Sequence, residues 1–132
     1  MMRFVLIAVG VLCATPAFAQ GTFPPSSFKN LQVLPKDAAA AVVVGMMKSF
    51  AVGRGVRCQF CHIGKEGMPL EQFDFVSDEI PQKKTARAMM KLVADINRTL
   101  DAAIPLQAGA AARVTCLTCH RGKSTPDTQK AP

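Results

Sequence analysis

Apolar residues recur at helical spacing in two stretches of this 132-residue chain. In the first stretch, Val43, Met47 and Phe50 occupy positions i, i+4 and i+7, which lie on one face of a helix. Asp37 is a suitable N-cap residue, and glycines follow the last apolar position. The pattern therefore predicts a helix from about 38 to 52.

The second stretch begins at Pro81, a residue that suits the first position of a helix. Its apolar residues recur at steps of three and four: Ala86, Met89, Val93, Ile96 and Leu100. This amphipathic pattern predicts a helix from Pro81 to about Leu100.

Glycine and proline punctuate the segments around these helices. Residues 63–79 predict a loop with a short turn, and residues 106–112 predict a short helix. No stretch shows the alternation of apolar and polar residues that is typical of a strand. The sequence therefore predicts an all-α, loop-rich fold.

The start of the chain has the organisation of an export signal. Arg3 precedes an apolar run from Phe4 to Cys13, and residues 17–19 have the small-x-small form of a cleavage site. The run is shorter than a membrane-spanning helix, so we favour a cleaved signal over a membrane anchor. We therefore expect cleavage after Ala19 and a mature chain in the periplasm, with no membrane span.

Composition divides the chain into four parts. Residues 1–19 form the signal peptide, and residues 20–33 form an extended leader rich in proline and serine. Residues 34–123 contain both predicted long helices and form the folded domain. The polar residues 124–132 form a flexible tail.

The charge balance is basic. Hydrophobic residues make up 49% and charged residues 19% of the chain, which is typical of a globular protein. Removing the signal peptide takes away one of 16 basic residues and leaves a formal charge of +6. This charge favours acidic partner surfaces. No basic cluster exceeds two residues, so we exclude nucleic acid.

Two copies of the pattern C-x-x-C-H dominate the candidate chemistry. The copies comprise Cys58, Cys61 and His62, and Cys116, Cys119 and His120. Cysteines at i and i+3 lie on one side of a helical turn, so both thiols can bond the two vinyl groups of one haem. The adjacent histidine then binds the iron, as in c-type cytochromes.

Two other readings of the cysteines are weaker. The four motif cysteines could bind zinc, but the gap between the pairs far exceeds the usual spacing, and zinc does not explain a histidine after each pair. A redox dithiol of the thioredoxin type needs a strand-helix-strand context, which this sequence lacks. We therefore predict two covalently attached haems c.

Ligand supply limits the sixth coordination position of each iron. His62 and His120 are the only histidines, so a bis-histidine site cannot form within one chain. The remaining donors are methionine, lysine, solvent, a partner's side chain, or none. Methionine is a soft ligand that favours ferrous iron. Five methionines follow the signal peptide: Met46, Met47, Met68, Met89 and Met90. Those on the predicted apolar faces are Met47 and Met89.

These residues together resemble the family of the cytochrome subunit of photosynthetic reaction centres. The likeness runs from about residue 31 to residue 123. It is carried by the segments "VLPKD" (33–37), "GMMKSF" (45–50), "GVRCQFCH" (55–62), "KTARAMMKLVADIN" (84–97) and "VTCLTCHRG" (114–122).

The resemblance implies a role for each site residue. In this family each haem unit consists of a helix with an axial methionine, a turn, and a C-x-x-C-H helix. Met47 would then bind the iron opposite His62, and Met89 the iron opposite His120. Met46, Met68 and Met90 are the alternatives. The reaction-centre subunit carries four haems, whereas this chain has motifs for two.

These expectations define a periplasmic di-haem cytochrome c that carries single electrons between redox partner proteins. A membrane electron-transfer complex or a reaction centre is one such partner. Several basic residues are candidates for docking to an acidic partner: Lys65, Lys83, Lys84, Arg87 and Arg121. The alternative function is a small di-haem enzyme or sensor, similar to a peroxidase, with one open haem site. No acid/base cluster accompanies either motif, so we expect an electron carrier.

Overall fold

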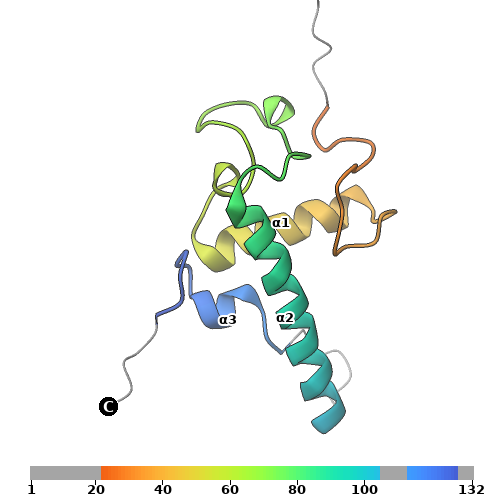
Figure 1. Cartoon of the computed structure of the whole chain (residues 1–132), viewed down its shortest axis with the longest axis vertical. Helices are drawn as coiled ribbons and strands as arrows, with labels where there is room; N and C mark the ends of the chain where they lie inside the picture. Colours follow the sequence, from red (N-terminus) through yellow and green to blue (C-terminus); the bar gives the residue numbers. More distant parts are fainter. Residues whose placement is uncertain (1–21, 105–112, 128–132) are drawn as a thin grey trace, which may run out of the picture.

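The computed structural model describes residues 22–104 and 113–127. Within these residues the chain forms three α-helices and two short 3-10 helices (Figure 1). The one strand-like pairing in the described part is an isolated antiparallel bridge between Ile63 and Asp74. The predicted all-α, loop-rich fold is therefore confirmed.

Helix α1 spans Ala40–Arg54. It begins later than predicted because the backbone N–H of Ala38 donates to the carbonyl of Pro35 in a turn, and Ala39, rather than Asp37, is the N-cap. The helix ends at Gly55, whose φ of 61° is the left-handed conformation that glycine adopts readily. The first helix is thus confirmed, with both ends shifted towards the C-terminus.

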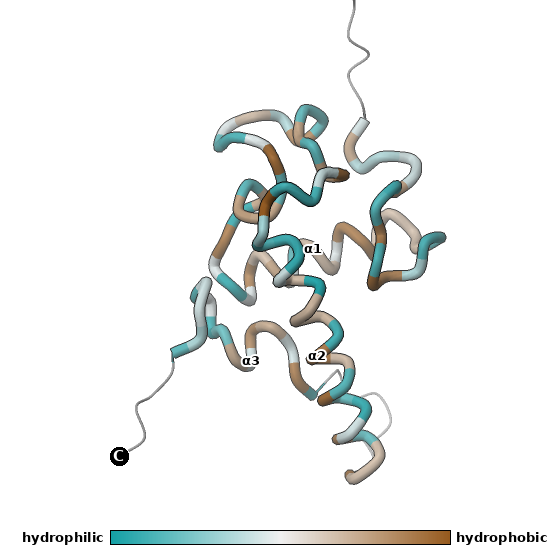
Figure 2. Tube along the Cα trace, in the orientation of Figure 1, coloured by the Kyte–Doolittle hydropathy of each residue, from teal (hydrophilic) through white to brown (hydrophobic). Residues whose placement is uncertain are grey.

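Helix α2 spans Pro81–Ala103, with Pro81 in its first turn. It follows the predicted apolar pattern and extends three residues beyond Leu100. Hydrophilic and hydrophobic positions alternate along α2 in Figure 2, as expected for a helix with one face towards the protein. The third helix, α3, spans Cys116–His120 and contains the second C-x-x-C-H motif.

The 55–80 region is a loop that lies beyond one end of α2 (Figure 1). It contains the 3-10 turns η1 (Cys58–Phe60) and η2 (Leu70–Gln72). The second turn agrees with the short turn predicted within residues 63–79, and the first lies before that range. Asp74 donates its N–H to the carbonyl of Ile63, and this bond closes the loop at its base.

The polypeptide buries few apolar side chains completely. Among the described residues Val43, at 5% exposure, is the one hydrophobic side chain classed as buried. Met47 and Met89 on the predicted apolar faces are 36% and 42% exposed. Specific hydrogen bonds and close backbone contacts therefore position the helices, more than a large apolar core does.

A polar cluster around Asp78 joins the leader, the loop and α2. The carboxylate of Asp78 accepts from Lys83 Nζ at 3.2 Å and from Arg87 at 2.8 Å. Asn30 and Gln32 in the leader donate to the same carboxylate. We call these five residues the Asp78 cluster. It ties a segment with no regular secondary structure to the N-terminal end of α2.

Several predictions concern residues outside the described ranges. These are the signal peptide 1–19, the short helix over 106–112 and the end of the polar tail, residues 128–132. In the described part of the chain, no helix has both the length and the apolar character needed to cross a bilayer.

Candidate functional site

The first C-x-x-C-H motif folds as a single tight turn. The N–H groups of Cys61 and His62 both donate to the carbonyl of Cys58, at 3.2 Å and 3.0 Å. This turn brings Cys58 and Cys61 to the same side of the backbone and places His62 directly after them. Two thiols and one imidazole therefore share one local unit.

The His62 ring lies in an aromatic environment. It packs edge-on against Phe75, with 4.9 Å between ring centroids, and Phe75 in turn packs against Phe23 and Phe73. Burial, with smaller effects from Lys83 and Arg87, lowers the pKa of His62 to about 4. His62 is therefore neutral at pH 7, which is the protonation state that binds a metal ion.

The Nδ1 atom of His62 is buried and has no hydrogen-bond partner among the described residues. Buried polar atoms in folded proteins are rarely unpaired, so each such atom calls for an explanation. The neutral imidazole nevertheless has the protonation state of a metal ligand, since one ring nitrogen can bind a metal while the other keeps its proton.

The second motif adopts a more regular conformation. Thr115 and Thr118 form a reciprocal capping box at the start of α3. At its end, the His120 Nδ1 atom lies 2.9 Å from the carbonyl oxygen of Lys123. With Nδ1 donating to this oxygen, Nε2 keeps a free lone pair for a metal. Sequence and local structure thus orient this histidine for coordination.

The four motif cysteines are free thiols rather than disulfides. Burial raises the pKa of Cys61 and of Cys116, which keeps both thiols protonated at neutral pH. Within residues 22–104 and 113–127, no three Cys, His, Asp or Glu side chains come together in a metal-binding group. This arrangement does not match a four-cysteine zinc site, and it agrees with two separate haem-attachment units.

The second motif packs against the C-terminal end of α1, which directly precedes the first motif. A Cβ atom at Gly53 would lie only 2.9 Å from Cys116 Cβ, so glycine permits the close packing of α1 against α3. The N–H of Gly122 donates to the carbonyl of Gly53 at 2.9 Å. A Cβ atom at Gly55 would collide with the backbone of Gly122. We call residues 53–55 the junction.

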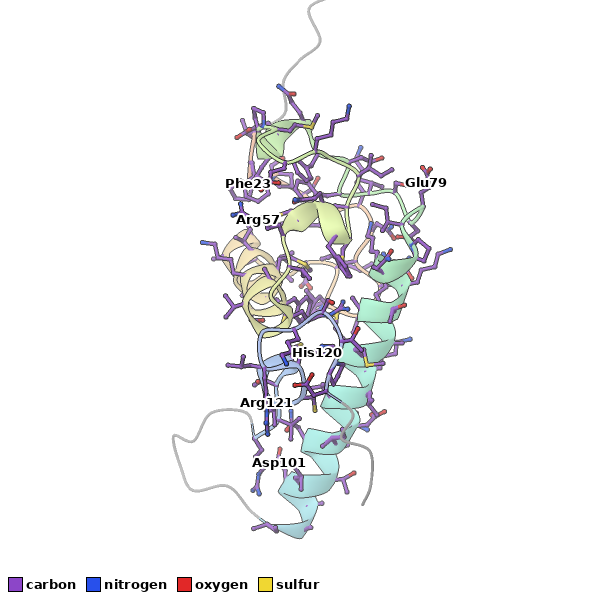
Figure 3. The ribbon with its side chains drawn as sticks, turned by 90° about the vertical axis from the view of Figure 1, so that its left-hand side faces the viewer. Phe23, Arg57, Glu79, Asp101, His120 and Arg121 are labelled. Carbon is purple, nitrogen blue, oxygen red and sulfur yellow. The ribbon has the colours of Figure 1, made fainter. Side chains whose placement is uncertain are left out.

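Figure 1 shows η1 and α3 on opposite sides of this end of α1. The view in Figure 3, turned by 90°, separates the two units in the same way. Arg57, next to the first motif, lies towards one end of the molecule, and His120 and Arg121 lie nearer Asp101. The junction therefore stands between the two candidate haem units.

Helix α2 is tied to the second motif by a paired amide contact. The Asn97 side chain donates to the carbonyl of Val114 and accepts from the N–H of Val114, both at 2.9 Å. Arg113 also pairs with Asp101 and donates to the carbonyl of Ile104. These bonds fix the segment before Cys116 against the helix that carries Met89.

The candidate methionines differ in their surroundings. Met47 on α1 and Met89 on α2 are partly exposed, whereas Met46 and Met90 are half-buried. The hydroxyl of Ser49 lies 3.9 Å from the Met46 sulfur. The fifth, Met68, lines a surface pocket with Cys58. Met47 and Met89, the more exposed member of each pair, remain the predicted iron ligands.

Comparison with known proteins agrees with this geometry. Residues 13–130 match the family described as photosynthetic reaction centre cytochrome C subunit. The chain belongs to this family. It is therefore a c-type cytochrome, a class of electron carriers with covalently bound haem, as the sequence motifs predicted.

One curated relative is cytochrome c-554 of Chloroflexus aurantiacus. The two sequences are 36% identical over 91 residues, which is 69% of this chain. The chain spans about a fifth of the length of that relative, since the match covers 20% of it. No solved structure matches the chain.

Two residues expected to steer docking have a different role. Lys83 is only 8% exposed, and its Nζ donates to the carbonyls of Phe75, Val76 and Ser77 as well as to Asp78. Arg87 is also largely covered and pairs with Asp78. The prediction that Lys83 and Arg87 form part of an exposed docking surface is therefore wrong. Lys65, Lys84 and Arg121 are exposed.

Sequence reasoning also missed residues that organise the site. Asn97 and the junction glycines position the second motif, and Asp78 gathers charges near the first. The glycines at positions 53 and 55, which the sequence analysis interpreted as the end of the first helix, were the available signal, because glycine also permits a close approach of two backbones.

Proposed function

We propose that the protein is a periplasmic di-haem c-type cytochrome that carries single electrons between redox partners. The observation that carries this proposal is the repeated unit. Each C-x-x-C-H motif forms a compact turn or helix with free thiols and an adjacent imidazole suited to bind iron.

The site residues divide into two sets. Cys58 and Cys61 would hold the first haem, and His62 and Met47 would bind its iron. The second set has the same order: Cys116, Cys119, His120 and Met89. The bound haem supplies a one-electron couple between ferric and ferrous iron.

The residues of the chain prepare and tune this couple. The carbonyl of Lys123 fixes the tautomer and the orientation of His120. Burial keeps His62 neutral. Thioether ligands stabilise ferrous iron and thereby raise the reduction potential. Lys65, Lys84 and Arg121 offer exposed positive charge for an acidic partner.

The localisation rests on the sequence of residues 1–19. Their basic start, apolar run and small-residue cleavage site favour export. A periplasmic carrier would pass electrons to or from a membrane complex. A reaction centre is a candidate partner because of the family to which the chain belongs.

The test is expression of the full chain in a bacterium that matures c-type cytochromes. The wild type should carry two haems per chain, retain haem under denaturing electrophoresis and be recovered from the periplasm without residues 1–19. The paired variants Cys58→Ala/Cys61→Ala and Cys116→Ala/Cys119→Ala should each retain one haem. A colourless protein, or a single haem in the wild type, would contradict the proposal.

Carbon monoxide distinguishes the carrier from the alternative enzyme or sensor. Two histidine/methionine-ligated irons should bind carbon monoxide slowly or not at all. A rapid spectral change at one haem would instead indicate an open coordination position and favour the enzyme or sensor.

A further inference from the structure

The Arg54 side chain contacts the first candidate haem unit and also the segment that follows the second one. On one side its guanidinium carbon lies 5.0 Å from the centre of the Phe60 ring, and Phe60 stands between the two cysteines of the first motif. On the other side its Nη2 donates to the carbonyl of Ser124 at 2.8 Å, just after the second motif.

The neighbouring residues hold Arg54 in this position. Gly53 packs against Cys116 and accepts a hydrogen bond from Gly122, while Gly55 lies against the Gly122 backbone. The Arg54 side chain therefore leaves α1 between two glycines that pack against the second unit, and only a few residues before the first unit begins. Its Nε is buried and has no partner among the described residues.

The field of Arg54 reaches cysteines of both motifs. The Arg54 guanidinium lies beside Phe60, which directly precedes Cys61, and the adjacent residue Gly53 packs against Cys116. Since each haem is attached through these cysteines, the same charge would stand beside one edge of each ring.

We propose that Arg54 is a shared electrostatic residue that raises the reduction potentials of both haems together. This inference rests on the proposed di-haem function. A ferrous haem carries one positive charge fewer than a ferric haem, so a nearby permanent cation favours the reduced form. One arginine then acts on two iron centres and shifts both potentials in the same direction.

Two other cations near the motifs do not share this geometry. Arg57 immediately precedes Cys58, but its side chain is 77% exposed and pairs with Glu66 at 3.7 Å, so solvent and a counter-charge screen it. Lys83 lies near the first motif and forms part of the Asp78 cluster. Arg57 therefore provides a matched control for the loss of one positive charge.

The experiment compares Arg54→Gln with Arg57→Gln in the fully matured cytochrome. Haem content is measured first, and redox titration followed by visible absorption then gives two midpoint potentials. Arg54→Gln should lower the equilibrium constant for reduction of each haem by about tenfold, which is about 59 mV for a one-electron couple. Arg57→Gln should leave the second potential unchanged and shift the first by much less.

Two further variants separate charge from structure. Arg54→Lys keeps the positive charge and should keep both potentials close to those of the wild type. Arg54→Leu removes the charge without burying an unpaired polar group, and it serves as the neutral variant if Arg54→Gln does not retain both haems.

The outcomes distinguish the two proposals. Fewer than two haems in the wild type would overturn the proposed function itself. Two haems with only one potential lowered, or none, would overturn the shared role of Arg54 and leave the function intact. Equal losses in Arg54→Lys and Arg54→Gln would also overturn it, since the effect would then come from structure. The shared role is supported if both potentials fall together in Arg54→Gln or Arg54→Leu and neither falls in Arg54→Lys.

Discussion

The two C-x-x-C-H units share a motif and differ in almost every surrounding contact. The first is a 3-10 turn whose histidine packs against Phe75 and has a buried Nδ1 without a partner in the described structure. The second is a capped α-helix whose histidine makes a hydrogen bond to the Lys123 carbonyl. The motif therefore defines the attachment chemistry, and the rest of the chain defines the environment of each imidazole.

This difference has a direct electronic consequence. A hydrogen bond from Nδ1 to a carbonyl raises the basicity of an imidazole, which stabilises ferric iron. The first unit lacks that bond among the described residues and lies near the positive side chains of Lys83 and Arg87. We therefore expect the first haem to have the higher reduction potential.

Removing the axial methionines should produce the largest change. Met47→Ala should affect only the first haem and Met89→Ala only the second, because each thioether serves one iron. Each variant should lose at least about tenfold in the reduction equilibrium of its own haem, about 59 mV, or convert that haem to high spin. Redox titration and visible spectroscopy measure both effects.

Met46→Ala and Met90→Ala are the matched controls, since each removes the neighbouring methionine on the same helix. They should leave both spectra and both potentials unchanged. If a control variant loses the low-spin spectrum and its neighbour does not, the ligand is the other member of the pair.

Breaking the paired amide contact of Asn97 should have an intermediate effect. Asn97→Ala leaves the N–H and the carbonyl of Val114 without these partners. We expect a loss of about 1–3 kcal/mol in the free energy of unfolding, because two hydrogen bonds at a partly buried site disappear. Denaturant unfolding, followed at the absorption of each haem, measures the loss.

In Asn97→Ala, the absorption of the second haem should change at a lower denaturant concentration than that of the first, since Asn97 fixes the segment before Cys116. Thr99→Ala removes a side chain that bonds only to its own helix, at the Asp95 carbonyl, and should have little effect. Equal destabilisation in the two variants would show that α2 itself, and not its link to the second unit, had been weakened.

The smallest predicted effect is a loss of folding stability at acidic pH, which arises from Asp78 near the first unit. The Arg87 guanidinium, followed by Lys83, holds the pKa of Asp78 well below its ordinary value. The folded state thus binds the Asp78 proton less readily than the unfolded state, so this contribution to stability is complete above about pH 5 and declines as the pH falls below 4.

Asp78→Asn should be less stable than the wild type at neutral pH, and the difference should shrink in acid. Unfolding measured between pH 2 and 7 would show this convergence. Asp127→Asn is the control, because Asp127 pairs with Lys123 on an exposed surface and should show no such trend. A constant difference between Asp78→Asn and wild type at every pH would contradict the prediction.

Local sequence patterns were sufficient for the helices and the motifs. The apolar spacing around Val93 predicted α2, and the spacing of the cysteines predicted that each pair lies on one turn. Both features depend only on neighbours within a few residues. Helix ends were less predictable. Asp37 looked like an N-cap, but a turn at Pro35 placed the start of α1 two residues beyond 38.

Long-range contacts were not predictable in the same way. Lys83 carries the same charge as its neighbour Lys84 and lies in the same helical turn, yet only Lys83 faces three loop carbonyls and Asp78. The pairing of Gly53 with Cys116 joins residues more than 60 positions apart. No local pattern encodes such contacts, which depend on how the loop and the helices return to each other.

The hydrogen bond between Gly53 and Gly122 also affects how the chain folds during synthesis and whether fragments of it can fold alone. The end of α1 reaches its final contacts only after the chain has been made as far as residue 124, since Gly53 and Arg54 pair with Gly122 and Ser124. Cutting the protein between its helices would not yield two independent mini-cytochromes. Each half would lose backbone contacts that the other supplies, so we expect the two C-x-x-C-H units to fold together.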